Sequence, residues 1–305
     1  MSDLRSLEIF YWAAQLKSFS RTAERLNTTQ PAVSQRISAL EAEFGTRLFD
    51  RGAKAISLTP KGQVLVDFAE RFLRLRGEMV EAMATPSAIR GTLRLGVSES
   101  IARLWLNQFL QQAHQIYPNV VIDLTIDITP IMRDQLRRGE LDLAFFLGPV
   151  TEPQFCNVPL CTLPLVFAAA PDLVLEHEEP LSIEAVRKFP IITYPKTTSP
   201  YPLLRELLSS PNEPAPRIFG NSSLTTIIRM TRDRIGLSVI PRAVIEKEIA
   251  EGLIRTVLTA FDIPPHVFTA TYPMAMSGGL AGPLADLAQK ISHEALPDNI
   301  PATDI

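Results

Sequence analysis

The stretch of sequence that decides the fold is residues 20–49, SRTAERLNTTQPAVSQRISALEAEFGTRLF. Its first part predicts a short helix over residues 21–26, which Ser20 is placed to cap. Residues 27–29 are Asn-Thr-Thr, whose side chains favour local turn hydrogen bonds. Pro31 then fits the first turn of a second helix, where its missing N–H costs nothing. The stretch therefore predicts two helices joined by a tight turn.

The second helix has an apolar face and a polar face, and Gly45 is placed to end it. The apolar residues that recur at helical spacing are Val33, Ile37, Leu40 and Phe44. The polar face carries short amide and hydroxyl groups, which bond base edges when such a helix enters the major groove. An ordinary helical hairpin with a polar outer face is the alternative. The residues predicted to contact DNA from these helices are Ser20, Thr29, Gln30, Pro31, Ser34, Gln35, Arg36 and Ser38.

A basic hairpin follows over residues 47–58, with apolar residues in strand-like alternation on either side of a turn at Gly52. Arg51 and Lys54 project from it and are predicted to lie along DNA phosphates, which gives affinity without sequence information. Basic residues on a loop are often just solvated surface, but their place beside the helix pair favours a DNA-binding wing.

These residues also carry a resemblance to a known family. The segment LEIFYWAAQLKSFSRTAERLNTTQPAVSQRISALEAEFGTRLFDR, followed by LTPKG, resembles the LysR-type transcriptional regulators. The resemblance implies an α/β protein overall: a winged helix-turn-helix, a long linker helix, and a two-lobed effector domain similar to periplasmic solute-binding proteins. It further implies a homodimer or a homotetramer built from two dimers, with RNA polymerase as a candidate partner.

The expected division has three parts: a DNA-binding domain over residues 1–58, a linker helix over 59–90 and an effector domain over 91–305. In the last part, strand and helix patterns alternate from residue 92 onward, interrupted by a Pro-rich crossing at 149–164. Lobe I is expected over about residues 91–162 and 266–305, and lobe II over about 163–265. Domains of this kind bind ligands between the lobes, at strand carboxyl ends and helix amino ends.

Charge is distributed unevenly along the 305 residues. Residues 1–61 hold nine Lys and Arg against six Asp and Glu, a net of +3, and the remainder holds a net of −6. The overall net charge of −3 therefore does not argue against DNA as a partner. The chain opens without a secretory signal pattern and has no apolar run of the ~20 residues that a membrane helix needs, so we expect a cytoplasmic protein that spans no membrane.

The linker region predicts one helix from Thr59, as the cap, to about Ala84. An apolar stripe runs along it at three- and four-residue spacing, and a helix of this length between two domains favours pairing with a second copy. The alternative is that the stripe docks on its own domain. The residues predicted in the dimer seam are Leu65, Phe68, Phe72, Leu75 and Met79.

Hydroxyl and apolar side chains follow several predicted strands of the effector domain. A helix amino end with two hydroxyls suits a carboxylate, so the predicted effector is a small organic acid. For any one Ser or Thr a helix cap is the alternative reading. The predicted effector contacts are Ser98, Ser100, Thr129, Phe146, Leu147, Thr198, Tyr201 and Ser222, of which the resemblance also implies Ser98, Ser100, Thr129 and Thr198. One departure from the family is Arg234, where a glycine often lies at a left-handed helix end.

Other functions are weaker predictions. Cys156 and Cys161 leave a thiol redox-sensing regulator as an alternative, and a binding or transport module with a DNA-binding-like appendage is another. The four histidines show no metal-ligand spacing, and no catalytic motif appears. We therefore expect no enzyme, no metal and no cofactor, but a regulator that binds double-stranded DNA and a small molecule.

Overall fold

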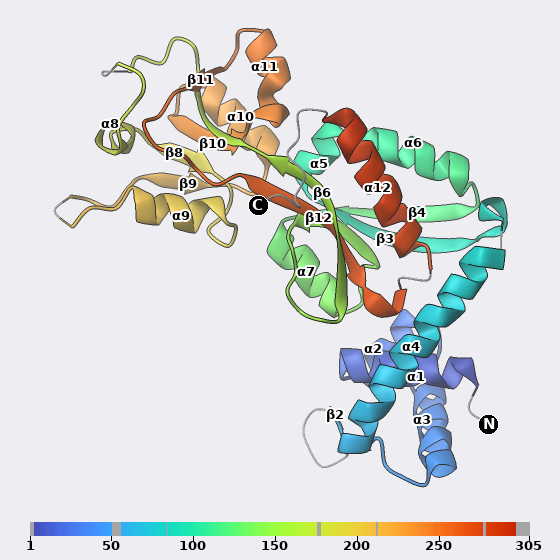
Figure 1. The fold of residues 1–305 in the computed structure, drawn as a ribbon. Helices are drawn as coiled ribbons and strands as arrows, with labels where there is room; N and C mark the ends of the chain where they lie inside the picture. The colour runs from blue at the N-terminus through green and yellow to red at the C-terminus, as the bar shows by residue number, and fades with distance from the viewer. Residues whose placement is uncertain are drawn as a thin grey trace.

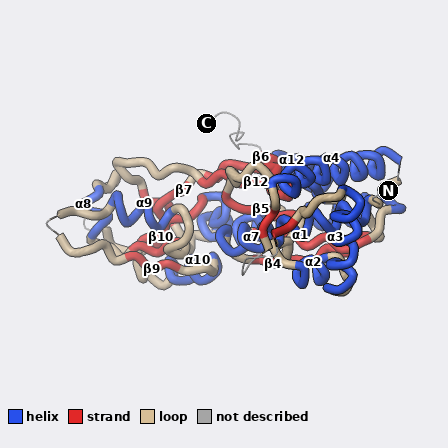
Figure 2. Tube along the Cα trace, turned by 90° about the horizontal axis from the view of Figure 1, so that it is seen from below, coloured by secondary structure: helices blue, strands red, loops and turns tan. Residues whose placement is uncertain are grey.

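The computed structural model describes residues 3–50, 56–83, 85–175, 178–211, 213–276 and 279–296. Figures 1 and 2 show an elongated molecule in which an N-terminal helical domain, lobe I and lobe II follow one another in a row. No helix in the described part of the chain is long and apolar enough to cross a membrane.

The N-terminal domain packs three helices and a small hairpin around one apolar core. Its helix α2 begins one residue after Ser18, whose Oγ accepts a hydrogen bond from the Arg21 N–H at 3.3 Å. The prediction that Ser20 caps this helix was wrong, because Ser20 lies inside the first turn. The elements are α1 (Leu4–Leu16), α2 (Phe19–Arg25), α3 (Gln30–Phe44), β1 (Phe49–Asp50) and β2 (Ser57–Leu58).

Helix α4 (Pro60–Met83) leads from this domain to lobe I (Figure 1). Thr59 caps it as predicted, since its Oγ1 accepts a hydrogen bond from the Gly62 N–H at 3.0 Å. Val66, Ala69 and Leu73 bury one face of α4 against the N-terminal core. A 3-10 turn, η1 (Pro86–Ala88), precedes the first strand of lobe I.

Lobe I is a five-stranded sheet in the order β4-β3-β5-β12-β6. Strand β3 runs parallel to β4 and β5, whereas β12, which returns from lobe II, runs antiparallel to β5 and β6. The strands are β3 (Gly91–Val97), β4 (Val120–Ile126), β5 (Leu143–Leu147), β6 (Phe155–Leu163) and β12 (His266–Pro273). The helices are α5 (Glu99–Leu104), α6 (Leu106–Ile116), α7 (Thr129–Arg137), η3 (Met274–Met276) and α12 (Ala281–Ala295).

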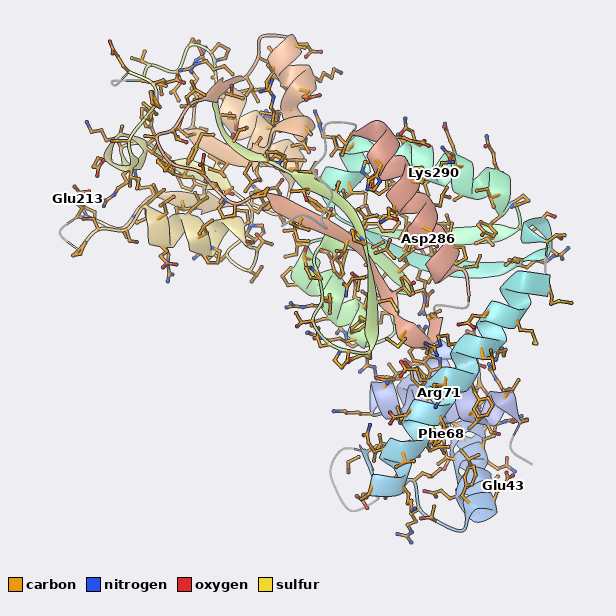
Figure 3. The ribbon with its side chains drawn as sticks, in the orientation of Figure 1. Glu43, Phe68, Arg71, Glu213, Asp286 and Lys290 are labelled. Carbon is orange, nitrogen blue, oxygen red and sulfur yellow. The ribbon has the colours of Figure 1, made fainter. Side chains whose placement is uncertain are left out.

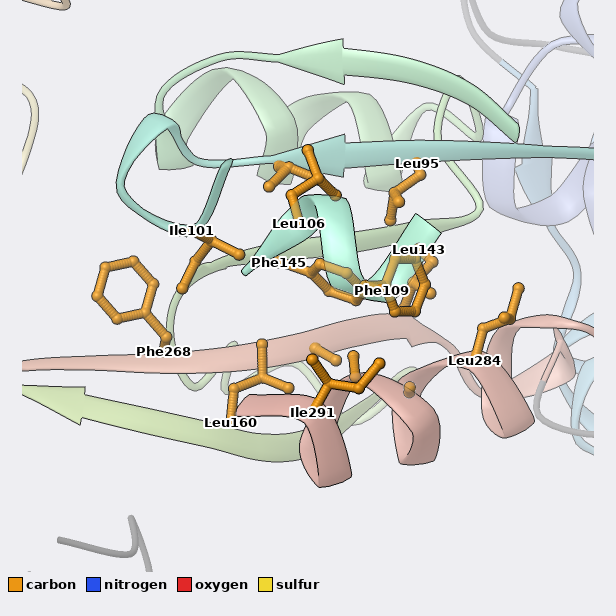
Figure 4. Close-up of a cluster of buried hydrophobic side chains, with 14 of the residues drawn as sticks. Leu95, Ile101, Leu106, Phe109, Leu143, Phe145, Leu160, Phe268, Leu284 and Ile291 are labelled. Carbon is orange, nitrogen blue, oxygen red and sulfur yellow. The ribbon is translucent and has the colours of Figure 1, made fainter. Parts of the chain in front are cut away.

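Adjacent residues of β5 face opposite sides of the lobe I sheet, because side chains alternate along a strand. Phe145 packs with Phe109 of α6, with ring centroids 5.2 Å apart, in the core that α12 completes (Figure 4). Phe146 faces the other side and packs with Met132 of α7. Each buried ring contributes about 1.5–3 kcal/mol of hydrophobic stabilisation.

Lobe II has its own five-stranded sheet in the order β11-β7-β10-β8-β9. The strands are β7 (Leu165–Ala169), β8 (Ile191–Thr193), β9 (Ile218–Gly220), β10 (Leu237–Pro241) and β11 (Arg255–Val257). The helices are α8 (Ile183–Arg187), α9 (Pro200–Leu207), α10 (Leu224–Arg232), η2 (Arg242–Ile245) and α11 (Glu246–Ala250). With this lobe, the predicted class is confirmed: an N-terminal helix-turn-helix domain and a two-lobed α/β domain.

Two predicted elements differ from the structure. The sequence of residues 101–116 predicts one continuous helix, but the structure divides it at Trp105, whose φ of −144° is not helical, so α5 and α6 are separate. The Pro-rich crossing expected at 149–164 also differs, because β6 of lobe I occupies most of it and the chain passes to lobe II only after Leu163. Pro159 is tolerated there because β6 lies at the edge of the sheet, where a strand can lack one N–H donor.

Candidate nucleic-acid interface and effector cavity

Helix α3 presents a polar face to solvent. Thr29 caps it, accepting a hydrogen bond from the Ala32 N–H at 3.4 Å, and Gly45 ends it at a positive φ of 62°. Phe44 was predicted to join the buried stripe but is 47% exposed at the end of the helix. The buried residues of the helix are Val33, Ile37 and Leu40, and the exposed residues at predicted DNA positions include Gln30, Gln35 and Ser38.

The other predicted DNA contacts differ in how far they are exposed and in their partners. Ser34 is half-buried on α3, and Arg36 forms an ion pair with Asp3 at 2.8 Å, which turns its guanidinium toward the start of α1. Hydrogen bonds from Ser6 and Arg36 lower the pKa of Asp3 to about 2. Arg51 and Lys54, at the tip of the predicted wing, lie outside the described residues.

The hairpin that bears the wing is fixed to the end of α3. Phe49 of β1 pairs with Leu58 of β2, so the predicted hairpin forms. Glu41 Oε1 accepts hydrogen bonds from the N–H groups of Leu48, at 2.8 Å, and Phe49, at 3.2 Å. The sequence analysis did not predict this contact. The only sequence signal for it is the position of Glu41 one turn before Gly45.

Helix α4 carries an apolar stripe that nothing in the described chain covers. The exposed members of this stripe are Val64, Phe68, Phe72, Leu75, Met79 and Met83, with exposures between 49% and 83%. Figure 3 shows Phe68 and Arg71 on this helix. Leu65 does not belong to the exposed stripe, because it packs against the N-terminal core beside Val66.

A buried ion pair joins the N-terminal domain to lobe I. Arg25 of α2 donates a hydrogen bond to Asp142 Oδ1 at 2.9 Å and another to the Gly139 carbonyl. Its guanidinium also lies 3.7 Å from the centre of the Trp12 ring. The side chains of Arg25 and Asp142 are 6% and 5% exposed, so this contact is shielded from water.

Asp142 has a second cationic partner in Arg94 of β3, whose Nη2 lies 2.7 Å from Asp142 Oδ1. Burial alone would raise the pKa of Asp142, but hydrogen bonds from Arg94 and the charge of Arg25 outweigh it. The pKa of Asp142 therefore lies below its ordinary value, and the carboxylate stays charged at neutral pH.

A cavity of about 230 Å³ lies between the two lobes. From lobe I it is lined by Ser98, Glu99, Ser100, Ile126, Asp127, Ile128, Thr129, Leu147, His266 and Phe268, and from lobe II by Tyr194, Thr198, Ser222 and Ser223. Six predicted effector residues thus meet at one place: Ser98, Ser100, Thr129, Leu147, Thr198 and Ser222.

Two predicted effector residues do not line this cavity. Phe146 is fully buried on the opposite face of the sheet, in the cluster with Met132. Tyr201 lies on α9 beside Gly220, outside the lining. The prediction had overlooked that successive residues of β5 point to opposite faces, so Leu147 reaches the cavity and Phe146 cannot.

Some hydroxyls of the cavity already have partners. Ser100 Oγ lies 3.2 Å from Tyr194 Oη across the two lobes, and Thr129 Oγ1 accepts a hydrogen bond from the Leu147 N–H at 3.2 Å. Thr198 Oγ1 donates to the Pro195 carbonyl at 2.7 Å. Ser98 differs, because its Oγ is buried without a hydrogen-bond partner among the described residues.

His266, which the sequence did not suggest, is 4% exposed, and its Nε2 has no hydrogen-bond partner in the described structure. Burial lowers the pKa of His266 to about 4, so its ring is neutral at pH 7. The Tyr194 and Phe268 rings flank it, with centroids at 5.6 and 6.1 Å. The sequence signal for His266 is its place at the start of β12, the strand that returns from lobe II to lobe I.

Helix α5 ties the two lobes together beside the cavity. Glu99 accepts hydrogen bonds from the backbone N–H groups of Leu224, at 2.6 Å, and Thr225, at 3.3 Å, and so occupies the amino end of α10. One turn later, Arg103 donates to the Val244 carbonyl at 2.7 Å and pairs with Glu248 at 2.5 Å.

Two family models together match most of the chain. Residues 4–63 match the bacterial regulatory helix-turn-helix protein of the lysR family, and residues 86–281 match the LysR substrate binding domain. The chain belongs to the LysR family of transcriptional regulators. It is therefore a DNA-binding regulator with an effector-binding domain, as the sequence resemblance predicted.

Relatives of this LysR-family regulator include two proteins of Bacillus subtilis strain 168. The transcriptional regulator GltR is 30% identical over 254 residues, 83% of this chain and 84% of GltR. The uncharacterized regulator YusT is 31% identical over 249 residues, 82% of each chain. Among solved structures, full-length OxyR from Pseudomonas aeruginosa is 22% identical with a TM-score of 0.67, covering 98% of both chains. At this identity the similarity to OxyR shows a shared fold.

The thiols of this LysR-family regulator lie far apart on one strand. Cys156 and Cys161 both belong to β6, and five residues of extended strand span roughly 16 Å, against about 6 Å between disulfide-bonded Cα atoms. Burial raises the pKa of both thiols, that of Cys161 to about 12. Thiolate formation is thus disfavoured at both positions, which weighs against the redox-sensing alternative.

Proposed function

We propose that the regulator recognises specific DNA sites through α3, whose exposed Gln30 and Gln35 reach base edges in the major groove. The observation that carries this proposal is the polar, solvent-facing side of a helix whose other side is anchored in the N-terminal core. Arg51 and Lys54 of the wing would hold the adjacent phosphates, adding affinity that is independent of sequence.

Replacing Gln35 with Ala tests the groove assignment. Affinity for the specific site should fall about 5- to 150-fold, corresponding to ~1–3 kcal/mol, because a side-chain contact with a base edge is lost. Binding to unrelated DNA should stay near wild type, as measured by fluorescence anisotropy at fixed salt. Gln111→Ala, an exposed change on α6, is the control for both affinities. An equal loss on specific and unrelated DNA would show that Gln35 does not read bases.

We also propose that the exposed stripe of α4 pairs with the same stripe of a second copy. Phe68, Phe72 and Leu75 are each about half exposed or more, although their neighbours Val66, Ala69 and Leu73 are buried. A row of large apolar side chains along 24 helical residues is typical of a coiled-coil seam. Dimerisation would present two copies of α3 to two half-sites on the DNA, and further association into a tetramer is the extension that the family resemblance suggests.

Leu75→Glu tests this seam, because a buried, unpaired carboxylate in a helix–helix interface is strongly unfavourable. The variant should sediment as a smaller species than wild type and lose affinity for a two-half-site DNA. Gln63→Glu, roughly on the opposite side of α4, is the matched control and should sediment like wild type. A wild-type oligomer in Leu75→Glu would place the seam elsewhere.

We propose that a small molecule binding in the inter-lobe cavity controls this activity. Such a ligand shifts the regulator toward one arrangement of the lobes only if it binds that arrangement more tightly. The small carboxylate predicted from the sequence stays a prediction. The hydroxyls of Ser98 and Ser222 favour it, whereas the carboxylates of Glu99 and Asp127 in the same lining weigh against it. Recruitment of RNA polymerase is a further candidate output of the regulator.

A further inference from the structure

The charged side chains that line the inter-lobe cavity have one sign. Glu99 and Asp127 are the acidic members of the described lining, and no Lys or Arg belongs to it. His266 adds no positive charge at pH 7, because burial lowers its pKa to about 4. A carboxylate placed here would meet two negative charges without a cation to offset them.

The amino end of α10, which borders the cavity in lobe II, is already occupied. Glu99 accepts the N–H groups of Leu224 and Thr225 at 2.6 and 3.3 Å, and the Thr225 hydroxyl lies 3.2 Å from the same carboxylate. These are the groups that an effector carboxylate would otherwise use at α10. The protein's own carboxylate therefore fills the anion site at α10.

Only one carboxylate oxygen of Asp127 accepts a hydrogen bond from the described residues. Its Oδ1 accepts the Ile128 N–H at 2.7 Å, and its other oxygen has no hydrogen-bond or ion-pair partner among the described residues. Asp127 follows β4 directly and is half-buried at the cavity wall. An acidic oxygen in this position can accept a charge-assisted hydrogen bond from a bound cation.

Two buried polar atoms in the same lining also lack partners. His266 is 4% exposed with an unpaired Nε2, and Ser98 Oγ is buried and unpaired among the described residues. A buried polar group without a partner costs about 1–3 kcal/mol, so a ligand that pairs with it gains affinity. A neutral imidazole nitrogen and a hydroxyl can both accept from an ammonium group, which has three donors.

We propose that this cavity binds a small organic amine, protonated at neutral pH, whose ammonium group is held by Asp127 with Ser98 and His266 as neutral partners. This assignment rests on the proposed role of the cavity as the effector site, and it names the chemical class of that effector. The volume of about 230 Å³ corresponds to roughly eight water-sized groups, which suits a short carbon chain or one small ring.

The test compares straight-chain primary amines with carboxylates of equal carbon number, titrated into the full-length protein by calorimetry. The amines should bind and the carboxylates should not. Asp127→Asn keeps the acceptor for the Ile128 N–H but removes the charge, so amine affinity should fall about 10- to 100-fold. Asp123→Asn, an exposed change on β4 outside the lining, should bind amines like wild type. Asp127→Lys should exchange the preference, so that carboxylates bind and amines do not.

Three results would overturn the assignment: tighter binding of carboxylates to the wild type, equal loss of amine affinity in the Asp123 and Asp127 variants, or no binding of any amine. Wild-type binding to specific and unrelated DNA is measured in parallel. Failure of the amines with intact DNA discrimination would remove the effector class and leave the regulator proposal standing. Absence of DNA discrimination would instead count against the proposed function itself.

Discussion

Lobe I is held to its two neighbours by ion pairs of different character. Toward the N-terminal domain, Arg25 and Asp142 are 6% and 5% exposed, and Arg94, which is 29% exposed, is a second partner of Asp142. Toward lobe II, Arg103 is 34% exposed and its partner Glu248 12%, and Glu99 bonds to backbone N–H groups at the cavity wall. The Arg25 and Asp142 side chains are almost excluded from water, whereas Arg103 keeps about a third of its surface exposed.

This difference predicts that the N-terminal domain is held firmly to lobe I, whereas the contacts between lobe I and lobe II can break and re-form. Breaking a buried pair leaves a charge without compensation in a medium of low polarity, which costs far more than breaking an exposed pair. At the cavity, water or a ligand can take over a lost hydrogen bond. We therefore expect lobe II to change position relative to lobe I more readily than the N-terminal domain does.

The largest effect is expected from Arg25→Met, which removes the buried cation but keeps an unbranched side chain against Trp12. Asp142 retains Arg94, so the cost should lie near the lower end of the range for a broken buried pair, about 3 kcal/mol. Hydrogen exchange should show faster opening of α2 and of residues 139–142. Arg21→Met on the same helix is the control, because its pair with Glu140 is exposed and 3.9 Å long, worth ~0–1 kcal/mol. Equal opening in both variants would show that the buried pair holds the two domains together no better than the exposed pair.

Acid should distinguish the two joints. The folded-state pKa of His266 is about 4, below its ordinary 6.5, so between these values the unfolded chain binds more protons. Stability from this group is present above pH 6.5 and is lost as pH falls toward 4, by about 2 kcal/mol at pH 5. The pKa of Asp142 is lowered, so its contribution is lost only below the pKa of an unfolded aspartate, about 4.

Urea unfolding at pH 7 and pH 5 measures this difference. From pH 7 to pH 5, the free energy of unfolding of His266→Gln should fall by less than that of the wild type, because the variant lacks the imidazole that takes up the proton. His114→Gln, an exposed change on α6, should lose as much as wild type. An unchanged loss in His266→Gln would mean that another group causes the pH dependence.

Local patterns were the part of this molecule that could be predicted. The buried face formed by Val33, Ile37 and Leu40 and the end signals of α3 appear as expected, and so does the Thr59 cap of α4, because each depends on residues within a few positions. The sequence left open how the helix before Arg234 ends, and in the structure Arg234 itself adopts a φ of 61° after α10. Its guanidinium pairs with Asp172 at the surface.

Contacts between distant segments were not predictable from the same patterns. Arg25 and Asp142 lie 117 positions apart, and no local pattern in the sequence pairs them. Asp127, Tyr194 and His266 come from three separate segments, and the cavity forms only when both sheets and the crossing are in place. A single sequence records the residues at strand ends but not which ends meet.

Glu99→Gln should have the smallest effect on stability, and it tests the contact between lobe I and lobe II beside the cavity. The amide keeps an oxygen for one N–H of α10 but loses the charge, which costs about 1 kcal/mol through weaker hydrogen bonds and the lost interaction with the helix dipole. Hydrogen exchange at the first turn of α10 should quicken accordingly, while residues 139–142 at the buried joint keep wild-type protection. Glu294→Gln, in an exposed pair 3.9 Å long on α12, is the matched control and should change neither segment. If α10 in Glu99→Gln opens as readily as α2 does in Arg25→Met, the inter-lobe joint is as firmly closed as the buried one. Lobe II would then not move relative to lobe I unless the effector first broke the contact between Glu99 and α10. In the absence of that break, the two lobes would move as one body.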